Sequence, residues 1–238
     1  MTLALSACAS AALALVLLGL TGPAYRIGLL SLAQALMLLR WAGYAGAAAL
    51  AAGLLAGLLA YRRGARLRTL IAAAAMLGAA IAVVIPLETL RRYEGAPPIH
   101  DVTTDLENPP TFEAIVPLRS EASNSLERSP AVSAEQRRFY PDLAPITLPV
   151  PPDQAFGRAL ALAQEAGWTI VTADRGSGRI EATAATRWFG FADDIVVRLT
   201  PWGSGTRVDI RASAREERTD AGRNARRIRR FLRALQSS

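Results

Sequence analysis

The sequence predicts an α+β fold in which transmembrane helices precede a soluble domain made of a short strand, a helix, a four-stranded antiparallel sheet and a second helix. Two observations predict it. The first third of the 238-residue chain is dominated by Ala, Leu, Gly and Val, and the last third contains four segments of alternating apolar and polar residues. Composition divides the chain into a transmembrane region (1–90), a Pro-rich linker or strap (91–145) and a soluble α+β domain (146–238).

The first region contains apolar runs long enough to cross a bilayer as helices, which takes about 20 residues. Three such runs lie at 3–20, 41–60 and 69–87. A further apolar stretch, 25–40, is bracketed by Arg26 and Arg40. We expect it to form either an interfacial helix or part of a tilted second span, so that the region contains about three transmembrane helices.

Charge sets the expected orientation of these spans, because short loops rich in Arg or Lys stay in the cytoplasm. The connection between the second and third runs carries such a cluster: Arg62, Arg63, Arg66 and Arg68. The N-terminus is therefore expected inside and everything after Leu87 outside. Every basic residue is Arg, which is typical of high-GC bacterial genomes. The predicted location is a bacterial inner membrane, multi-pass, with a periplasmic soluble domain.

The use of cysteine and histidine excludes several kinds of chemistry. The only Cys, Cys8, lies in an apolar run, and the only His, His100, lies in a Pro-rich segment. The soluble domain therefore has no residues for a disulfide, a thiolate metal site or His-based catalysis. We expect no metal and no cofactor, and binding in preference to catalysis. The formal charge of +7 suits several anionic partners, but nucleic acid is not expected outside the cytoplasm.

Periodicity places the elements of the soluble domain. A short edge strand is predicted at 146–150, a helix from Pro152 to Gly167, and a last helix from Thr219 or Asp220. Four alternating segments are predicted as strands: 168–173, 179–187, 194–200 and 206–215. One sheet face is apolar, so both helices should pack on it. The order is similar to the helix-grip domains of lipoprotein accessory subunits in outer-membrane barrel assembly.

The other face of the predicted sheet is polar and rich in Arg. It carries Glu181, Thr183, Arg187, Arg198, Arg207, Asp209, Arg211, Ser213 and Arg215. Two interpretations are open. The side chains form cross-strand ion pairs on a solvated face, or the guanidinium groups bind an anionic or peptide ligand through bidentate contacts.

A hairpin between two of these strands holds the aromatic residues Trp188, Phe189 and Phe191, followed by Asp193 and Asp194. The aromatic side chains either fold back as a lid on the core or form an exposed patch that meets a partner or the bilayer interface. Adjacent carboxylates on a strand point to opposite faces, so no metal site is expected there.

The last helix is strongly basic, and its Arg side chains form either a solvated face or a surface for anionic lipid headgroups. They are Arg223, Arg226, Arg227, Arg229, Arg230 and Arg233. Asp220 and Asn224 lie one turn apart at its start, and their simplest role is to cap the helix against the sheet.

Several segments resemble the signature of the family named domain of unknown function 1499. The similarity is carried by GRIEAT at 178–183, TRWFGFADDIVVR at 186–198 and GTRVDIR at 205–211. It covers roughly Glu107 to the C-terminus and implies no activity, because the family is uncharacterised. Together with the polar face, it selects the binding candidates: Trp188, Phe189, Phe191, Asp193, Asp194, Arg198, Arg211, Arg215, Asp220 and Asn224.

The sequence thus favours a non-enzymatic, membrane-anchored envelope protein whose periplasmic domain binds a protein partner or anionic lipid headgroups. The alternative is an enzyme or carrier for a small anionic envelope metabolite. A deep pocket lined by Glu181, Arg198 and Arg211 would favour that alternative, and a filled sheet face would count against it. A third possibility is a structural membrane subunit.

Overall fold

The described part of the chain forms two compact units. The computed structural model describes residues 2–120, 122–216 and 219–237. By their contacts, one unit comprises Met1–Arg92 with Arg187–Gly190, and the other comprises Tyr93–Thr186 with Phe191–Ser238. The first unit holds the apolar helices and the second holds the sheet.

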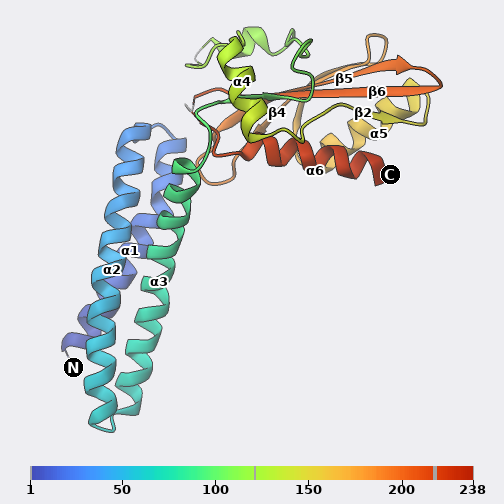
Figure 1. Cartoon of the computed structure of the whole chain (residues 1–238). Helices are drawn as coiled ribbons and strands as arrows, with labels where there is room; N and C mark the ends of the chain where they lie inside the picture. The colour runs from blue at the N-terminus through green and yellow to red at the C-terminus, as the bar shows by residue number, and fades with distance from the viewer. Residues whose placement is uncertain (1, 121, 217–218, 238) are drawn as a thin grey trace. The chain divides into compact units, whose positions relative to one another are not determined.

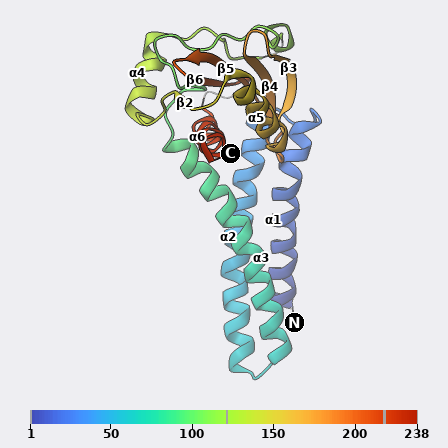
Figure 2. The same cartoon turned by 90° about the vertical axis from the view of Figure 1, so that its right-hand side faces the viewer.

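The first unit is built from three long helices, which run side by side in Figure 2. They are α1 (Thr2–Arg26), α2 (Leu32–Arg62) and α3 (Arg66–Glu94). Each is long and apolar enough to cross a membrane, judged by length and composition. The stretch 25–40 is not a separate interfacial helix, because most of it forms the beginning of α2.

Small residues let α2 and α3 approach closely. A Cβ atom added at Gly46 would lie 3.0 Å from the Cβ of Ala82, and one added at Gly53 would lie 2.8 Å from the Cγ of Met76. A buried cluster drawn from all three helices consists of Ala7, Ala11, Ala49, Ala75 and Ala79. Close packing of small residues is one of the main forces that associate helices in a membrane.

The second unit is an antiparallel sheet with helices on both sides. Its first part contains β1 (Asp101–Thr103), the 3-10 turn η1 (Val116–Arg119), α4 (Pro130–Phe139) and β2 (Ile146–Leu148). Its second part contains α5 (Pro152–Glu165), β3 (Thr169–Asp174), β4 (Arg179–Ala185), β5 (Ala192–Trp202), β6 (Gly205–Ala214) and α6 (Arg223–Ser237). Each predicted strand and helix is present close to its expected bounds, which confirms the α+β fold class.

The strands are arranged in the order β1-β6-β5-β4-β3, and β2 also pairs with β6. β1 and β2 share the outer edge of β6, where Val102 is opposite Ala212 and Thr147 is opposite Arg207. β2 is the edge strand that the sequence predicts. The sequence does not predict β1, because three residues are too few to show an alternating pattern.

The hydrophobic core lies between the sheet and the helices α5 and α6, which cover one face of the sheet in Figure 1. Ile195 and Val197 of β5 and Ile210 of β6 point into it and are fully buried. Phe156 of α5 and Ile228 of α6 close it from the helix side. Both helices therefore turn their apolar stripes toward the core, as the periodicity predicts.

The segment 91–145, expected as a linker or strap, contributes a layer of the second unit from residue 101 onward. This part, called the strap below (residues 101–145), contains β1, η1 and α4, and α4 lies on the sheet face opposite α6 in Figure 1. Phe112 and Ile115 of the strap pack on Val196, whose side chain points to the polar face of β5. The polar sheet face is therefore covered rather than solvated.

Candidate functional site

One ion-paired group closes the polar face of β6. Arg211 donates to the carboxylate of Asp101 on β1, with Nη2 2.8 Å from Oδ2. Arg128 of the strap approaches the same carboxylate at 2.6 Å and also donates to Gln136 of α4. All three charged side chains are almost fully buried. Burial lowers the pKa of Arg128, because loss of water outweighs the attraction of Asp101.

A second group joins the strap to β5. Asp194 is fully buried and accepts from Arg119 of η1 at 2.6 Å, from Thr183 of β4 at 2.8 Å and from Arg215 at 2.8 Å. The hydrogen bond to Asp194 raises the pKa of Arg215. Since both guanidinium groups depend on one carboxylate, the sheet and the strap are tied together at this point.

Two further residues of the polar face, Glu181 and the binding candidate Arg198, also hold the strap. Glu181 of β4 accepts the backbone N–H groups of Glu113 at 2.8 Å and Ile115 at 2.9 Å. Arg198 of β5 lies 3.3 Å from Asp105 of the strap and 3.1 Å from Asp209 of β6. Together with the Arg211 pair, these contacts fill the face where a deep pocket would have favoured an enzyme or a carrier.

The strap partners are missing from the candidates that the sequence suggests. They are Asp101, Asp105, Arg119 and Arg128. A signal for the two carboxylates exists, because the polar face has more Arg than carboxylate residues and a buried guanidinium needs a carboxylate. The acidic residues of the Pro-rich segment, Asp101 and Asp105 among them, were the available partners.

Asp193 points to the opposite face from Asp194, as adjacent strand residues should. Its carboxylate receives Arg223 at 2.7 Å and Arg227 at 2.8 Å, both from α6. The Asn224 side-chain amide lies 3.4 Å from the same carboxylate. These contacts fix the start of α6 over the start of β5. Within residues 2–120, 122–216 and 219–237, no group of three or more His, Cys, Asp or Glu could hold a metal ion.

Asp220 caps the beginning of α6. Its carboxylate accepts the backbone N–H groups of Gly222 and Asn224, each at 2.8 Å, which satisfies donors that a helix start leaves open. The carboxyl group is fully buried, and this burial raises its pKa, with nearby Asp193 acting in the same direction. Asn224 also accepts a hydrogen bond from Arg227 through its side-chain oxygen.

The aromatic residues of the hairpin fall into different units. Trp188 and Phe189 belong by contacts to the first unit, where the Trp188 indole N–H donates to the Gly19 carbonyl at 3.3 Å. Phe191 belongs to the second unit and lies beneath the Arg223 guanidinium, 5.8 Å from it. Phe189 and Phe191 are both buried. The three aromatic side chains therefore do not form one exposed patch.

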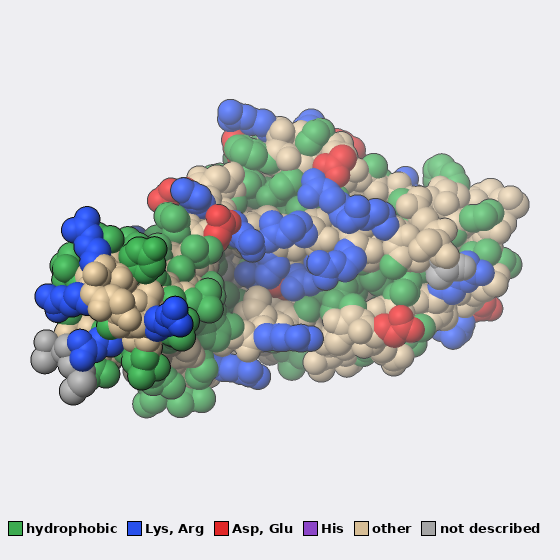
Figure 3. Space-filling view, turned by 90° about the horizontal axis from the view of Figure 1, so that it is seen from below, with side chains coloured by type: hydrophobic (Ala, Val, Ile, Leu, Met, Phe, Trp, Pro, Cys, Tyr) green, Lys and Arg blue, Asp and Glu red, His purple; other side chains and the backbone are tan. Residues whose placement is uncertain are grey.

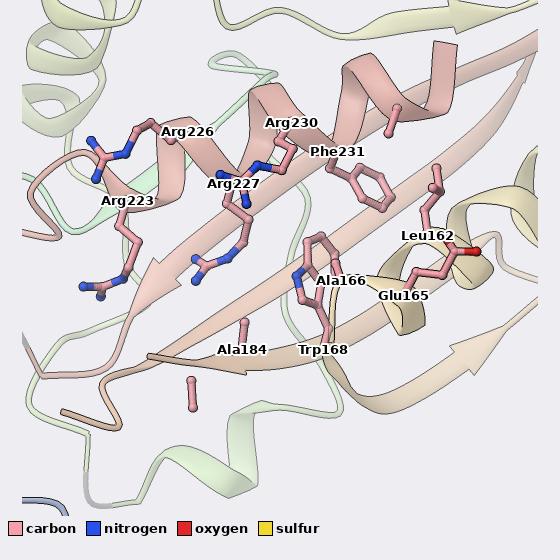
Figure 4. Close-up of a pocket in the computed structure, with 13 residues that line it drawn as sticks. Leu162, Glu165, Ala166, Trp168, Ala184, Arg223, Arg226, Arg227, Arg230 and Phe231 are labelled. Carbon is pink, nitrogen blue, oxygen red and sulfur yellow. The ribbon is translucent and has the colours of Figure 1, made fainter. Parts of the chain in front are cut away.

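A hollow of about 460 Å³ lies between the C-terminal end of α5 and one side of α6 (Figure 4). Leu162 and the stacked rings of Trp168 and Phe231, with centroids 5.0 Å apart, form apolar walls. Four Arg side chains of α6 also line it: Arg223, Arg226, Arg227 and Arg230. Small-ligand sites commonly have volumes of about 300–1,000 Å³, so this hollow is large enough for a ligand.

The end of α5 explains why Trp168 lines this hollow. Gly167 adopts a φ of +74°, a left-handed conformation that glycine takes without strain. Its N–H donates to the Gln164 carbonyl, and the Trp168 N–H donates to the Ala163 carbonyl, which is the usual glycine-terminated helix end. The chain turns sharply, and Trp168 is placed against α6. Sequence reasoning identified Gly167 as a stop but not Trp168 as part of a site.

The Arg residues of α6 differ in their surroundings. Arg223 and Arg227 pair with Asp193, and Arg229 pairs with Asp142 at 2.5 Å. Arg226, Arg230 and Arg233 are exposed. Figure 3 shows basic side chains gathered on the face seen from below, where α6 lies in Figure 1. Within the described residues, the guanidinium of Arg230 has no hydrogen bond or ion pair.

The geometry defines a class of protein: helices long and apolar enough to cross a membrane, joined to an antiparallel α+β domain whose polar face is closed by a strap. Residues 101–235 match the family model described as "Protein of unknown function (DUF1499)". The match covers more than half of the chain, and the protein therefore belongs to this family. It begins a few residues before the resemblance found in the sequence.

None of the curated proteins compared with the chain matches it. Among solved structures, the crystal structure of Ara h 8.0201 is similar at 13% identity, over 39% of this chain and 92% of that chain, with a TM-score of 0.24.

Proposed function

We propose that this protein is a membrane-anchored binding protein of the bacterial envelope, not an enzyme. Its second unit recognises the phosphate headgroup of an anionic lipid through the basic side of α6. The distribution of charge carries this proposal. The Arg residues of the sheet are held by carboxylates of the strap and the sheet, whereas Arg226, Arg230 and Arg233 are exposed on one helix.

The membrane location is supported by the first unit and its charges. Three helices have the length and hydropathy of membrane spans. The turn between α2 and α3 exposes Arg62, Arg63, Arg66 and Arg68, and such clusters stay in the cytoplasm. With three spans, this orientation leads the second unit into the periplasm of an inner-membrane protein.

Phosphate recognition suits the chemistry of α6. Guanidinium groups bind phosphate through two parallel hydrogen bonds, and basic residues near an anionic membrane each gain about 1 kcal/mol. A protein partner is less well supported, because Asp194, Arg198 and Arg211 are occupied by contacts within the second unit. Because these side chains already have partners within the second unit, a catalytic or carrier site on the sheet is also less well supported.

The test uses the full chain in neutral detergent and native mass spectrometry to count bound phosphatidylglycerol and phosphatidylcholine. The wild type should retain phosphatidylglycerol preferentially. The variant R226Q/R230Q/R233Q should lose this preference by about tenfold or more, since each charged hydrogen bond contributes about 1.5–3 kcal/mol. Binding should also weaken as salt rises.

A matched control removes the same charge elsewhere on the second unit. Arg137 and Arg138 of α4 and Arg175 before β4 provide it as R137Q/R138Q/R175Q, and Arg137 and Arg175 are more than half exposed. This variant should bind phosphatidylglycerol like the wild type. An equal loss in both variants, or no preference in the wild type, would refute the proposed function and make a protein partner the next candidate.

A further inference from the structure

The hollow between α5 and α6 has walls of opposite character. Leu162, Trp168 and Phe231 provide an apolar wall, together with the small side chains of Ala166 and Ala184. The Arg side chains of α6 provide guanidinium groups along another part of the lining (Figure 4). A ligand that fills such a site must join an apolar part to an anionic group, because each wall alone would bind only half of it.

The basic wall is organised before any ligand arrives. Arg223, Arg227 and Arg230 are spaced by four and three residues, so they lie on one side of α6. Asp193 holds the first two at 2.7 and 2.8 Å, and Asn224 accepts from Arg227. Restricting these long side chains in advance lowers the entropy that binding would otherwise cost.

Arg230 supplies the charge that is left for a ligand. It lines the same hollow one turn beyond Arg227, and within the described residues it has no acidic partner. Glu165 at the α5 rim is the one acidic side chain among the lining residues. The lining therefore has more positive than negative charge, which suits one phosphate group.

We infer that this hollow takes up one single-chain phosphate lipid, with its phosphate on Arg227 and Arg230 and the start of its chain along Trp168 and Phe231. The inference rests on the proposed function and deepens it. In this inference one lipid molecule enters the hollow. Contact of α6 with a charged membrane surface alone would not achieve this. Free phosphate fits less well, because the Leu162 and Trp168 side offers an apolar surface with few donors.

The test again uses the full chain, reconstituted in phosphatidylcholine nanodiscs. Monoacyl phosphatidylglycerol is the probe, and native mass spectrometry measures its binding. Ala166 is exposed at the end of α5 and lines the hollow, whereas Ala161 is exposed on α5 and does not line it. Ala166→Phe should reduce affinity by about tenfold or more, and the matched Ala161→Phe should leave it unchanged.

A second readout locates the chain of the lipid. A brominated monoacyl phosphatidylglycerol quenches nearby indoles, and the Trp168 contribution is the difference between the wild type and Trp168→Phe. That contribution should be quenched, and the choline-headgroup probe should quench it far less. Arg230→Gln should weaken quenching by the phosphatidylglycerol probe.

The outcomes separate the inference from the proposed function. If Ala166→Phe binds like the wild type while R226Q/R230Q/R233Q loses binding, the lipid is held at the surface and the inference falls alone. If glycerol phosphate competes as well as the lipid, the site takes a free phosphate compound and the inference also falls. If charge has no effect on binding, the proposed function falls and the inference falls with it.

Discussion

The two faces of the sheet are held by different forces. On one face, Ile195, Val197 and Ile210 pack against α5 and α6, and removal of apolar area from water provides the stability. On the other face, Asp101 and Asp194 each receive two guanidinium groups. Buried ion pairs add little net stability, but they fix partners closely. The contrast indicates that the apolar face stabilises the domain, whereas the charged face determines where the strap lies.

The largest expected effect comes from removing a shared carboxylate on the charged face. Asp101→Ala leaves Arg128 and Arg211 buried without their carboxylate, and such a loss costs about 3–5 kcal/mol. Backbone hydrogen exchange of the full chain in neutral detergent should show lower protection in β6 and α4.

A triple replacement sharpens this prediction. Converting Asp101 to Leu and both Arg128 and Arg211 to Met removes every charge of the group at once. Replacing a buried ionic group by apolar residues of similar volume is often neutral or stabilising, so this variant should be more stable than Asp101→Ala. A triple variant that is less stable than Asp101→Ala would mean that the ion pairs themselves stabilise the domain.

A substitution on the apolar face should come next in size. Ile228 of α6 is fully buried in the core, and Ile228→Ala should cost about 2–5 kcal/mol through lost burial and a residual cavity. Because no charge is involved, this loss should not change between low and moderate salt. A strong dependence on salt would show that the apolar face also relies on electrostatics.

A smaller effect on the unfolding free energy, which depends on pH, is expected from Asp220. Burial raises its pKa in the folded protein, so its contribution to stability is fully present below the ordinary Asp pKa of about 3.9. The contribution is lost as pH rises through the raised value. The unfolding free energy of the wild type relative to Asp220→Asn should therefore fall as pH increases over this window. A difference that rises with pH would contradict the assigned burial effect.

The smallest effect is expected from the exposed pair of Asp142 and Arg229. Its two groups lie 2.5 Å apart, but the Asp142 side chain is 56% exposed. Surface pairs contribute about 0–1 kcal/mol, so Asp142→Ala should shift the unfolding free energy by less than about 1 kcal/mol. A loss as large as that of Asp101→Ala would remove the distinction between buried and exposed pairs.

Most of the fold follows from the sequence because alternation and helical periodicity are local signals. They predict β3 to β6, α5, α6 and the three apolar helices. They do not reveal β1, which is only three residues long, or that the strap covers the polar face. That cover depends on pairs far apart in the chain, such as Asp101 with Arg211 and Arg119 with Asp194, and a single sequence does not show them.

The candidate site was only partly accessible from the sequence for the same reason. The basic character of α6 and the capping role of Asp220 are visible in the residues themselves. The hollow is not, because Trp168 and Phe231 meet only when α5 and α6 pack together. Arg198, Arg211 and Arg215 look like a binding surface until the carboxylates of the strap and of neighbouring strands are seen to pair with them.

The central claim is that α6, and not the polar sheet face, recognises the anionic ligand. The direct measurement compares phosphatidylglycerol binding by two full-chain variants of equal charge, R226Q/R230Q on α6 and R198Q/R207Q on the sheet, after hydrogen exchange has verified that both are folded. Loss of binding is expected in R226Q/R230Q, and wild-type binding is expected in R198Q/R207Q. Loss in R198Q/R207Q with binding kept by R226Q/R230Q would contradict it.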